Sequence, residues 1–447
     1  MRRSLTLLLT TLIGISTFAC GCTKPETPSE GDKEPQPQPT VERTDLFAVK
    51  SAEDIAYRIP SIAVTQTGRL IAVVDYRIVR SDIGVVNNGR IDLHYRTSDD
   101  NGHTWSDTKV LIEGKGAEAT DFMSVGYGDP CIVADRESDR VLVMSCAGNV
   151  SFQNGTRQRH QNIARFYSED GGQTWSAPED IAESIYSQFD ESSYGPVRSM
   201  FVASGRIMQS STVKVGSHYR LYCAVLVRDK SATHMNYVLF SDDFGGSWKV
   251  LGDINEPAVY RTADEPKVEE LPNGTILISS RYNEGRYYNI FTFDDVASGT
   301  GSWDKAQFSG ANNRGVVATQ NSTNGEVAVI PVTRTSDNEP MHLLLQSVPM
   351  GPQRANVGIY YKELASELDD YISPYELARD WDGSLQVSTL NSAYSTMIWQ
   401  KDNNLGFFYE EETYGVSAHS YGGYNMVYES LSLEEITDGK YKYRATK

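Results

Sequence analysis

Ser98-Asp99-Asp100-Asn101-Gly102-His103-Thr104-Trp105 occurs, with small changes, three times in the chain. The other copies are Ser168-Glu169-Asp170-Gly171-Gly172-Gln173-Thr174-Trp175 and Ser241-Asp242-Asp243-Phe244-Gly245-Gly246-Ser247-Trp248. The shared pattern is S-x-D-x-G-x-[TS]-W, and its starts lie 70 residues apart (98 to 168) and then 73 apart (168 to 241). A turn that recurs at near-constant spacing indicates an array of repeated supersecondary units.

Each residue type in the repeat suits a tight turn. The Asp side chain accepts hydrogen bonds from backbone N–H groups of its own turn, the Gly supplies a positive φ, and the Trp buries a large ring against the sheet. Strand-like runs precede the copies, at Ile91–Arg96, Asn162–Tyr167 and Asn236–Phe240. The repeat therefore predicts one hairpin turn per blade of a β-propeller. A calcium loop is the alternative, but no copy has the glutamate that completes an EF-hand loop, and strands flank it instead of helices.

Length and composition favour an all-β chain. The 447 residues include 26 Tyr and 36 Gly, and long amphipathic helical patterns are scarce. Two weaker forms of the turn follow: Phe293-Asp294-Asp295 with Gly301-Ser302-Trp303, and the end of the strand Val357–Lys362, where the partly helical Leu364–Leu377 replaces the turn. At about 60–75 residues per blade, we predict an all-β, six-bladed β-propeller. Pairing of a strand near Phe47 with the last blade would close the ring.

The N-terminus predicts export. Two Arg precede the apolar run Leu5–Phe18, which is short for a membrane span and ends in Ala19-Cys20-Gly21-Cys22. This resembles a bacterial lipoprotein signal, with Cys20 or Cys22 lipidated; an ordinary cleaved secretory signal is the alternative. We predict a signal segment at 1–22, a Pro- and Glu-rich flexible tether at 23–44 and the propeller at 45–447. The protein would then be an exported lipoprotein on the periplasmic face or the cell surface.

Charge and cysteine content narrow the partners. The net charge of −18 argues against nucleic acid or an anionic membrane surface, so we expect membrane contact only through the anchor. Cys131, Cys146 and Cys223 form no CxxC pair; Cys131 and Cys146 can pair, but buried free thiols are expected. The seven His are scattered without a zinc pattern, and we predict no metal and no cofactor.

Short motifs at predicted strand ends carry the functional signal. In chain order they are Tyr57-Arg58-Ile59-Pro60, Asp75-Tyr76-Arg77 followed by Asp82, Gly128-Asp129-Pro130, Asp264-Glu265-Pro266, Ser279-Ser280-Arg281, Arg354 before Val357, Ala393-Tyr394-Ser395, and Tyr409-Glu410. In a chain with these turns, this ordered set resembles the bacterial exo-sialidase (neuraminidase) family, six-bladed propellers with Asp-box (BNR) repeats. The resemblance runs from about Tyr57 to Glu410, nearly the whole mature chain.

The resemblance implies a site for an acidic sugar. A sialic acid carries a carboxylate on its anomeric carbon, and Arg58, Arg281 and Arg354 would supply three planar, always-charged donors for it. Each stands at a strand end in a different predicted blade, and such ends meet over a propeller's axis. Glu410 would hold Arg58 in place as its acidic partner.

The resemblance also assigns catalytic roles. Most retaining glycosidases attack with a carboxylate, which the substrate's own carboxylate would repel; sialidases are the known exception with a tyrosine nucleophile, here Tyr394. Because free Tyr has a pKa of about 10, a base is needed, and Glu265 is the candidate. Asp82 would protonate the leaving oxygen and then activate water. The loop Ile83–Arg90 that follows Asp82 is longer than the family pattern.

Two more pairs complete the expected site, and the first of them is assigned by resemblance. Arg77 and Asp129 would read the O4 region of the sugar, although Asp129 before Pro130 also suits a simple turn. Phe122 and Met123 would line an apolar pocket for the N-acetyl methyl group.

The expected function is a retaining exo-α-sialidase that hydrolyses terminal sialic acids of sialylated glycans, as a monomer. A non-catalytic sialic-acid-binding propeller is one alternative, but such a protein needs neither Tyr394 nor Glu265. A trans-sialidase is a second. A propeller that shares only the turns, and acts on neutral polysaccharides or on nothing, is a third. The sequence motifs do not indicate a linkage preference.

Overall fold

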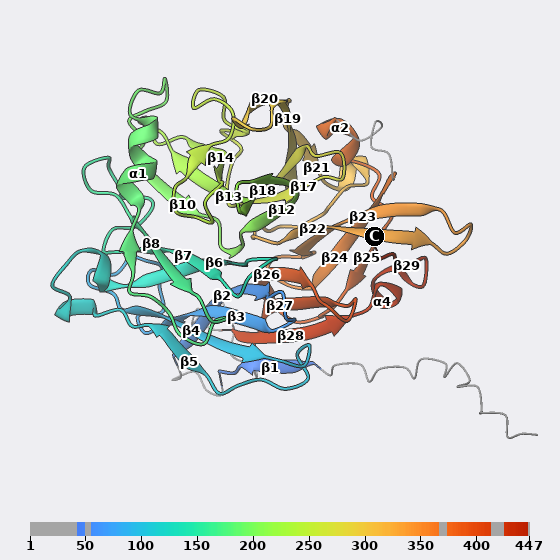
Figure 1. Cartoon of the computed structure of the whole chain (residues 1–447), viewed down its shortest axis with the longest axis horizontal. Helices are drawn as coiled ribbons and strands as arrows, with labels where there is room; N and C mark the ends of the chain where they lie inside the picture. Colours follow the sequence, from blue (N-terminus) through green and yellow to red (C-terminus); the bar gives the residue numbers. More distant parts are fainter. Residues whose placement is uncertain (1–42, 50–54, 366–372, 413–423, 446–447) are drawn as a thin grey trace, which may run out of the picture. The chain divides into compact units, whose positions relative to one another are not determined.

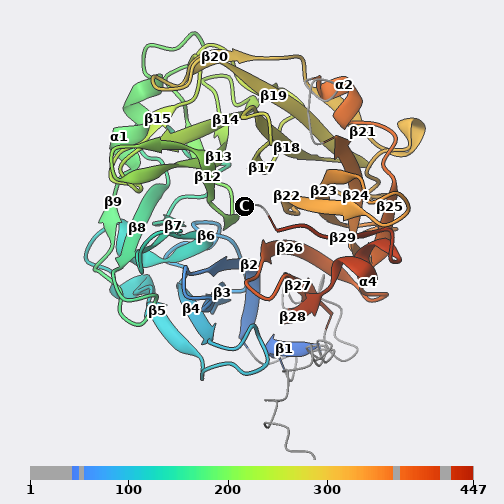
Figure 2. The ribbon, with the colours of Figure 1, turned by 45° about the vertical axis from the view of Figure 1, so that its right-hand side comes forward.

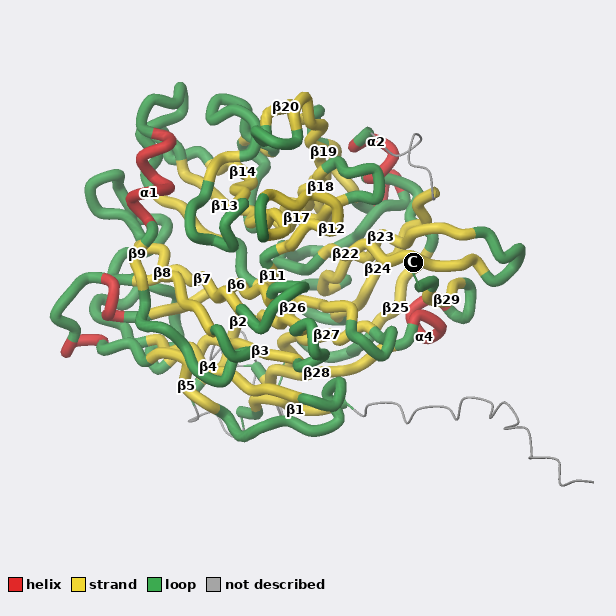
Figure 3. The backbone as a smooth tube through the Cα atoms, viewed as in Figure 1, coloured by secondary structure: helices red, strands yellow, loops and turns green. Residues whose placement is uncertain are grey.

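The structure, a computed structural model, describes residues 43–49, 55–365, 373–412 and 424–445. These residues form six mostly antiparallel β-sheets (Figure 1), and Figure 2 shows the sheets arranged as blades around a central axis. Figure 3 shows how few residues are helical. The predicted six-bladed β-propeller is confirmed. The predicted signal segment, with Cys20 and Cys22, and nearly all of the predicted tether lie outside the described residues.

Blades 1 to 3 follow one another along the chain. Blade 1 contains β2 (Ala56–Val64), β3 (Leu70–Arg77), β4 (Ile91–Ser98) and β5 (Lys109–Ile112). Blade 2 contains β6 (Tyr127–Ala134), β7 (Val141–Ala147), β8 (Asn162–Ser168), β9 (Glu179–Asp180) and, parallel to β6, β11 (Gly205–Arg206). Blade 3 contains β10 (Ser199–Val202), β12 (Met208–Val215), β13 (His218–Arg228), β14 (His234–Ser241), β15 (Lys249–Val250) and β16 (Val259–Tyr260).

Blades 4 to 6 complete the ring. Blade 4 contains β17 (Pro266–Glu270), β18 (Ile276–Tyr282), β19 (Gly285–Asp295), β20 (Thr300–Trp303) and β21 (Gln307–Ser309). Blade 5 contains β22 (Val327–Arg334), β23 (Pro340–Pro349), β24 (Val357–Ala365), β25 (Gly383–Gln386) and β29 (Tyr441–Tyr443). Blade 6 contains β26 (Ser392–Trp399), β27 (Leu405–Glu411), β28 (Asn425–Leu431) and β1 (Thr44–Phe47).

The helices are short and lie between strands. They are α1 (Ala182–Tyr186), α2 (Pro374–Leu377), α4 (Leu433–Thr437) and the 3₁₀ turns η1 (Gly116–Glu118), η2 (Met123–Val125), η3 (Ser187–Phe189) and η4 (Ala311–Asn313). Within the described ranges, no helix has the length and apolar character needed to cross a membrane.

The N-terminal strand closes the ring, as predicted. β1 pairs antiparallel with β28 of the last blade, and Phe47 stands opposite Met426. The last blade therefore takes its outermost strand from the beginning of the chain. This pairing protects an edge that an open ring would expose.

The repeated turn joins the third and fourth strands of blades 1, 2 and 3. In the first copy, Asp100 Oδ1 accepts a hydrogen bond from the Thr104 N–H at 2.8 Å, and Ser98 Oγ accepts one from the Gly102 N–H at 2.8 Å. The other two copies repeat both bonds. The predicted roles of Asp and of strand-flanked turns are confirmed.

The repeated turns also join neighbouring blades. Trp105 packs edge-on against Tyr428 of blade 6, with ring centroids 5.0 Å apart. Gly102 has a φ of +89°, and a Cβ at this position would lie 2.2 Å from the Tyr428 ring, so only glycine fits. In all three turns a backbone carbonyl accepts a hydrogen bond from a tyrosine hydroxyl on the third strand of the preceding blade: Tyr428 to Asn101, Tyr95 to Gln173, and Tyr167 to Phe244.

The weaker turns and the cysteines also match expectation. Asp295 ends β19 and accepts a hydrogen bond from the Ala297 N–H at 3.0 Å in the turn to β20. The next described element after β24 is α2, in the segment predicted to be partly helical, and residues 366–372 between them lie outside the described ranges. Cys131, Cys146 and Cys223 are buried free thiols, so the alternative Cys131–Cys146 pairing is wrong.

The hydrophobic core lies between the faces of adjacent blades. Ile71 and Val73 of blade 1, for example, belong to one buried cluster with Val141, Val143 and Phe166 of blade 2. Full burial of each such side chain contributes about 1.5–3 kcal/mol. Because apolar contacts between blade faces stabilise the ring, the polar residues at strand ends near the axis are not needed for packing and can form a site.

Candidate active site

A cavity of about 350 Å³ opens at one end of the ring. Seven of the nine predicted site residues line it: Arg58, Asp82, Asp129, Glu265, Arg281, Arg354 and Tyr394. Arg58, Asp129 and Tyr394 lie near the starts of β2, β6 and β26. Glu265 directly precedes β17, and Arg281 lies near the end of β18. Asp82 and Arg354 lie in the loops after β3 and β23. The other two, Arg77 and Glu410, are buried.

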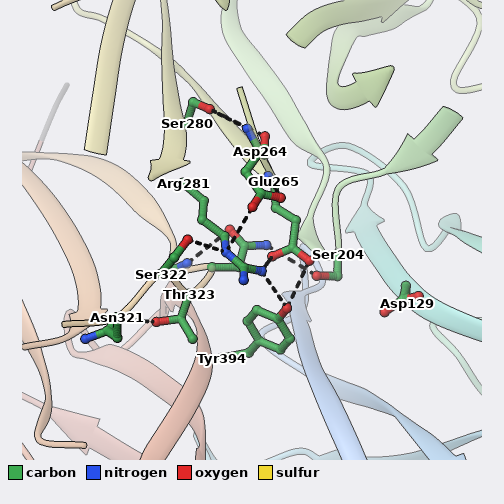
Figure 4. A network of polar contacts seen from close by, with 12 residues as sticks. Asp129, Ser204, Asp264, Glu265, Ser280, Arg281, Asn321, Ser322, Thr323 and Tyr394 are labelled. Carbon is green, nitrogen blue, oxygen red and sulfur yellow. Dashed lines mark hydrogen bonds and ion pairs between the residues drawn. The ribbon is translucent and has the colours of Figure 1, made fainter. Parts of the chain in front are cut away.

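Tyr394, Glu265 and Arg281 form one hydrogen-bonded group (Figure 4). The Tyr394 hydroxyl donates to Glu265 Oε1 at 2.9 Å. Arg281 Nη1 donates to Glu265 Oε2 and to the Tyr394 hydroxyl oxygen, both at 2.9 Å. Arg281 Nε donates to Ser322 Oγ at 2.9 Å, which fixes the guanidinium from the other side. A phenol bonded to a carboxylate is the arrangement that an activated hydroxyl nucleophile requires.

Three guanidinium groups surround the Tyr394 ring. The Cζ atoms of Arg58, Arg281 and Arg354 lie 5.6, 5.9 and 6.0 Å from its centroid. Of the three, Arg354 forms no ion pair with any residue that the structure describes. The convergence predicted for these residues is therefore present in the fold.

Glu410, wholly buried on β27, holds this group together. It accepts hydrogen bonds from Arg58 Nε at 2.7 Å and Nη2 at 3.3 Å, a bidentate pair. It also accepts from the backbone N–H groups of Ile59 at 2.8 Å and Tyr394 at 3.0 Å. One carboxylate thus positions an arginine and two strands of adjacent blades.

Irregular backbone aims the side chains into the cavity. Pairing registers shift between Arg58 and Ser61 and between Ser392 and Ser395, on either side of Tyr394. Ile59 has a φ of +59°, an outlier for a β-branched residue. β-Bulges re-aim side chains near active sites, and the Glu410 carboxylate binds the backbone at both.

A second group of charges surrounds Arg77. Its guanidinium pairs with Asp75 at 2.8 Å, with Asp129 at 3.4 Å and with Asp82. Asp75 Oδ1 also accepts a hydrogen bond from the Asp129 N–H at 2.8 Å. Arg77 is not among the described residues that line the cavity, so it supports Asp82 and Asp129 from behind. A direct role for Arg77 at the sugar stays a prediction.

The two groups differ in their ionisation. Burial, followed by the charge of Glu265, raises the pKa of Tyr394 well above its usual value. Burial, followed by the nearby Asp75, raises the pKa of Asp129 well above its usual range, and burial raises the pKa of Asp75 to about 6. The Arg77 guanidinium lowers the pKa of Asp82, whose side chain is 70% exposed. In the ligand-free protein Asp82 therefore favours the ionised form.

Several residues at the site were not predicted. Phe201 and Leu226 of blade 3, with Phe152, give the cavity an apolar wall, whereas Phe122 and Met123 are not among its described lining residues. Asp264 also lines the cavity, whereas Asp75 and Ser322 stand behind the lining residues. Asp75 lies two residues before Arg77, so its position in the D-x-R stretch was the available signal. Among the described residues, no group of three or more His, Cys, Asp or Glu is arranged to hold a metal ion.

Comparisons with known proteins find BNR-repeat and sialidase sequences. A family model described as a BNR repeat-like domain matches residues 86–231. A sialidase from Micromonospora viridifaciens is 27% identical over 433 residues, which cover 92% of this chain and 58% of that protein. A sialidase from Paraclostridium sordellii is 23% identical over 363 residues, covering 78% of this chain and 83% of that protein.

These matches are to BNR-repeat and sialidase sequences, the group that the ordered motifs of this chain resemble. The chain spans less than two thirds of the length of the Micromonospora relative. The leech intramolecular trans-sialidase has a TM-score of 0.66 at 16% identity, with 87% of this chain and 69% of that chain covered. The Hadza microbial sialidase Hz136 has a TM-score of 0.62 at 21% identity, with 86% and 67% covered. At these identities the structural likeness shows the propeller fold alone.

Proposed function

We propose that this protein is an exo-α-sialidase that removes terminal sialic acids from glycans with retention of configuration, with Tyr394 as the nucleophile. The observation that carries the proposal is the set of three guanidinium groups around one phenol that is bonded to a carboxylate. A sugar with a carboxylate on its anomeric carbon matches both features. The family names of the sequence relatives support the same class of substrate.

In the first step, the substrate carboxylate binds among Arg58, Arg281 and Arg354 beside Tyr394. The Tyr394 oxygen attacks the anomeric carbon while Glu265, at 2.9 Å, takes the phenolic proton. Asp82, in its protonated form, gives a proton to the glycosidic oxygen, and the bond to the leaving sugar breaks. Because burial raises the pKa of Tyr394, a free phenolate is disfavoured and proton transfer accompanies the attack.

In the second step, the ionised Asp82 takes a proton from a water molecule that attacks the anomeric carbon. The bond to the Tyr394 oxygen breaks, and Glu265 returns the proton to the phenol. The product is free sialic acid with the configuration of the substrate. Turnover ends in the protonation state from which the first step started, with Asp82 protonated and Glu265 ionised, and product release returns Asp82 to the ionised form that Arg77 favours.

One experiment tests the proposal directly. The purified protein is incubated with 3′-, 6′- and α2,8-linked sialosides, and the products are followed by proton NMR. We expect free sialic acid whose first-formed anomer is α. First-formed β anomer would disprove retention. The absence of any product from all linkages would instead favour a non-catalytic sialic-acid-binding propeller. A 2,7-anhydro product would identify an intramolecular trans-sialidase.

We also propose that the protein is an exported monomeric lipoprotein. The support is the apolar run before Ala19-Cys20-Gly21-Cys22. Metabolic labelling with an alkyne fatty acid tests the anchor in the full chain, in the Cys20→Ser and Cys22→Ser variants and in the double variant. Size-exclusion chromatography with light scattering tests the oligomeric state. Labelling that survives in the double variant would contradict the anchor.

A further inference from the structure

A second hollow adjoins the active-site cavity next to Asp82. Its volume is about 350 Å³, within the range of about 300–1,000 Å³ for clefts that take small ligands. The described residues that line it are Gly84, Val85, Asn87, Asn149, Val150, Asn154, Thr156 and Arg159. Val85 lines both spaces, and its N–H donates to the Asp82 carbonyl at 3.2 Å. The hollow therefore begins where the proposed proton donor lies.

Two loops that interlock form the wall of this hollow. One runs from residue 78 to 90 and contains the segment that is longer than the family pattern; the other runs from 148 to 161. The Asn88 N–H donates to Asn149 Oδ1 at 2.8 Å, and Asn149 Nδ2 donates to the side-chain oxygens of Asn88 at 2.8 Å and Asn87 at 3.2 Å. Gly84, with a φ of +68°, lies so close to Val150 that a Cβ would be 2.2 Å from its carbonyl carbon. The extra length of the first loop thus serves to reach the second.

The lining chemistry differs from that of the main cavity. None of the described lining residues is acidic, and three are asparagines, whose amides both donate and accept hydrogen bonds. Within the described part of the chain, the Asn154 amide makes no hydrogen bond. Val85 is 59% exposed and offers an apolar contact beside these amides. This combination suits a ligand that has many hydroxyl groups, an apolar ring face and no charge.

Arg159 is the one charged residue among the described lining residues, and it already contacts an aromatic ring. The Arg159 guanidinium lies over the Phe122 ring, 5.6 Å from its centroid. Compared with three converging guanidinium groups in the main cavity, one stacked arginine is a weak attraction for an anion. The hollow therefore favours a neutral ligand.

We propose that this hollow binds the neutral sugar residues to which the terminal sialic acid is attached, an inference that rests on the proposed function. Asp82 gives its proton to the leaving oxygen, so the leaving sugars must extend on the Asp82 side of the cavity. Val85 and Asn87 follow Asp82 on the same loop, and Asn154 faces them from the second loop. Recognition of the leaving sugars is thus built into the loop that carries the proton donor.

The test compares two substrates in one variant. Asn154→Ala removes an amide without an internal partner, so the fold is expected to persist. We expect kcat/KM for 3′-sialyllactose to fall about three- to tenfold, the effect of one or two hydrogen bonds to neutral groups. We expect no change for 4-methylumbelliferyl sialoside, which has no leaving sugar. Asn312→Ala, exposed on η4 and lining neither space, is the matched control and should change neither rate.

Failure of the inference and failure of the proposed function give different results. Equal loss on both substrates, or no loss on either, overturns the inference; no turnover of either substrate by the unmodified protein overturns the proposed function instead. Lactose binding followed by saturation-transfer NMR needs no turnover, and we expect Asn154→Ala to weaken it. A preference for substrates with a second sialic acid that disappears in Arg159→Ala would overturn the assignment to neutral sugars.

Discussion

Three guanidinium groups lie around Tyr394 in the cavity wall, whereas one guanidinium and three carboxyl groups lie in and behind the wall around Asp82. We name the first the phenol side (Arg58, Glu265, Arg281, Arg354, Tyr394) and the second the carboxylate side (Asp75, Arg77, Asp82, Asp129). The phenol side comes mainly from blades 4 to 6, and the carboxylate side from blades 1 and 2. Figure 4 shows Asp129 apart from the Tyr394 group.

The difference explains how one cavity can bind an anion and also deliver a proton. On the phenol side Arg354 lacks an acidic partner among the described residues, so an anionic ligand gains a charge-assisted contact there. On the carboxylate side one cation cannot balance three carboxyl groups, two of which are buried. The pKa values therefore separate: Arg77 lowers the pKa of Asp82, and burial raises the pKa of Asp129. Substitutions that change one side only can separate the two functions.

The largest effect is expected from Tyr394→Phe on the phenol side. Removal of the nucleophile should lower kcat on the order of 10³-fold or more. The arginines remain, so affinity for a 2,3-unsaturated sialic acid analogue, measured by calorimetry, should stay within about threefold. A variant with near-normal kcat would remove Tyr394 from the mechanism.

Asp82→Asn tests proton delivery from the carboxylate side. General acid catalysis contributes about 10²–10⁴-fold, and its loss matters most for a poor leaving group. We therefore expect kcat/KM to fall by about that factor for sialyllactose but much less for an aryl sialoside. Equal losses on both substrates would assign the proton to another group.

Arg354→Met removes one charge from the phenol side. Loss of a charge-assisted hydrogen bond should lower kcat/KM about 10- to 100-fold. The matched control is Arg314→Met, since Arg314 is 80% exposed and does not line the cavity. The hydrolysis of an aryl sialoside by both variants is the measurement. If both behave alike, Arg354 does not bind the substrate carboxylate.

The smallest effect is expected from Asp129→Asn, and it concerns pH. A carboxyl whose folded-state pKa is raised loses native stability as the pH rises from its unfolded-state pKa through its folded-state value. Asn cannot ionise, so the variant should melt about 1–3 °C higher than the unmodified protein at pH 7 and within error of it at pH 4. Differential scanning fluorimetry at both values checks this. A lower melting temperature at pH 7 would show that Asp129 is ionised in the native state.

The repeated turns and the motifs at the ends of strands could be predicted from the sequence. The spacing of Trp105, Trp175 and Trp248 gave the blade, and the ordered motifs gave the residues that meet over the axis. These succeed because a propeller brings equivalent strand ends together whatever their separation in the chain.

The contacts that support the site residues could not be predicted from the sequence, because they depend on backbone conformation and on how adjacent blades pack. Nothing around Ile59 signals a φ of +59°, and nothing links the Asp75 carboxylate to the Asp129 N–H. The apolar wall from Phe201 and Leu226 comes from a blade that carries no catalytic motif. The loop 83–90 was noticed for its length, but its partner, the loop that contains Asn149, follows only from the fold.

The bidentate contact between Arg58 and Glu410 joins residues separated by 352 positions, across the seam where the ring closes. A ribosome must therefore synthesise the chain as far as Glu410 before this contact can form. Any product that ends before Glu410 lacks the partner of Arg58 and the rest of blade 6. Such long-range contacts also slow folding. The fold thus makes assembly of the proposed site depend on synthesis of blade 6.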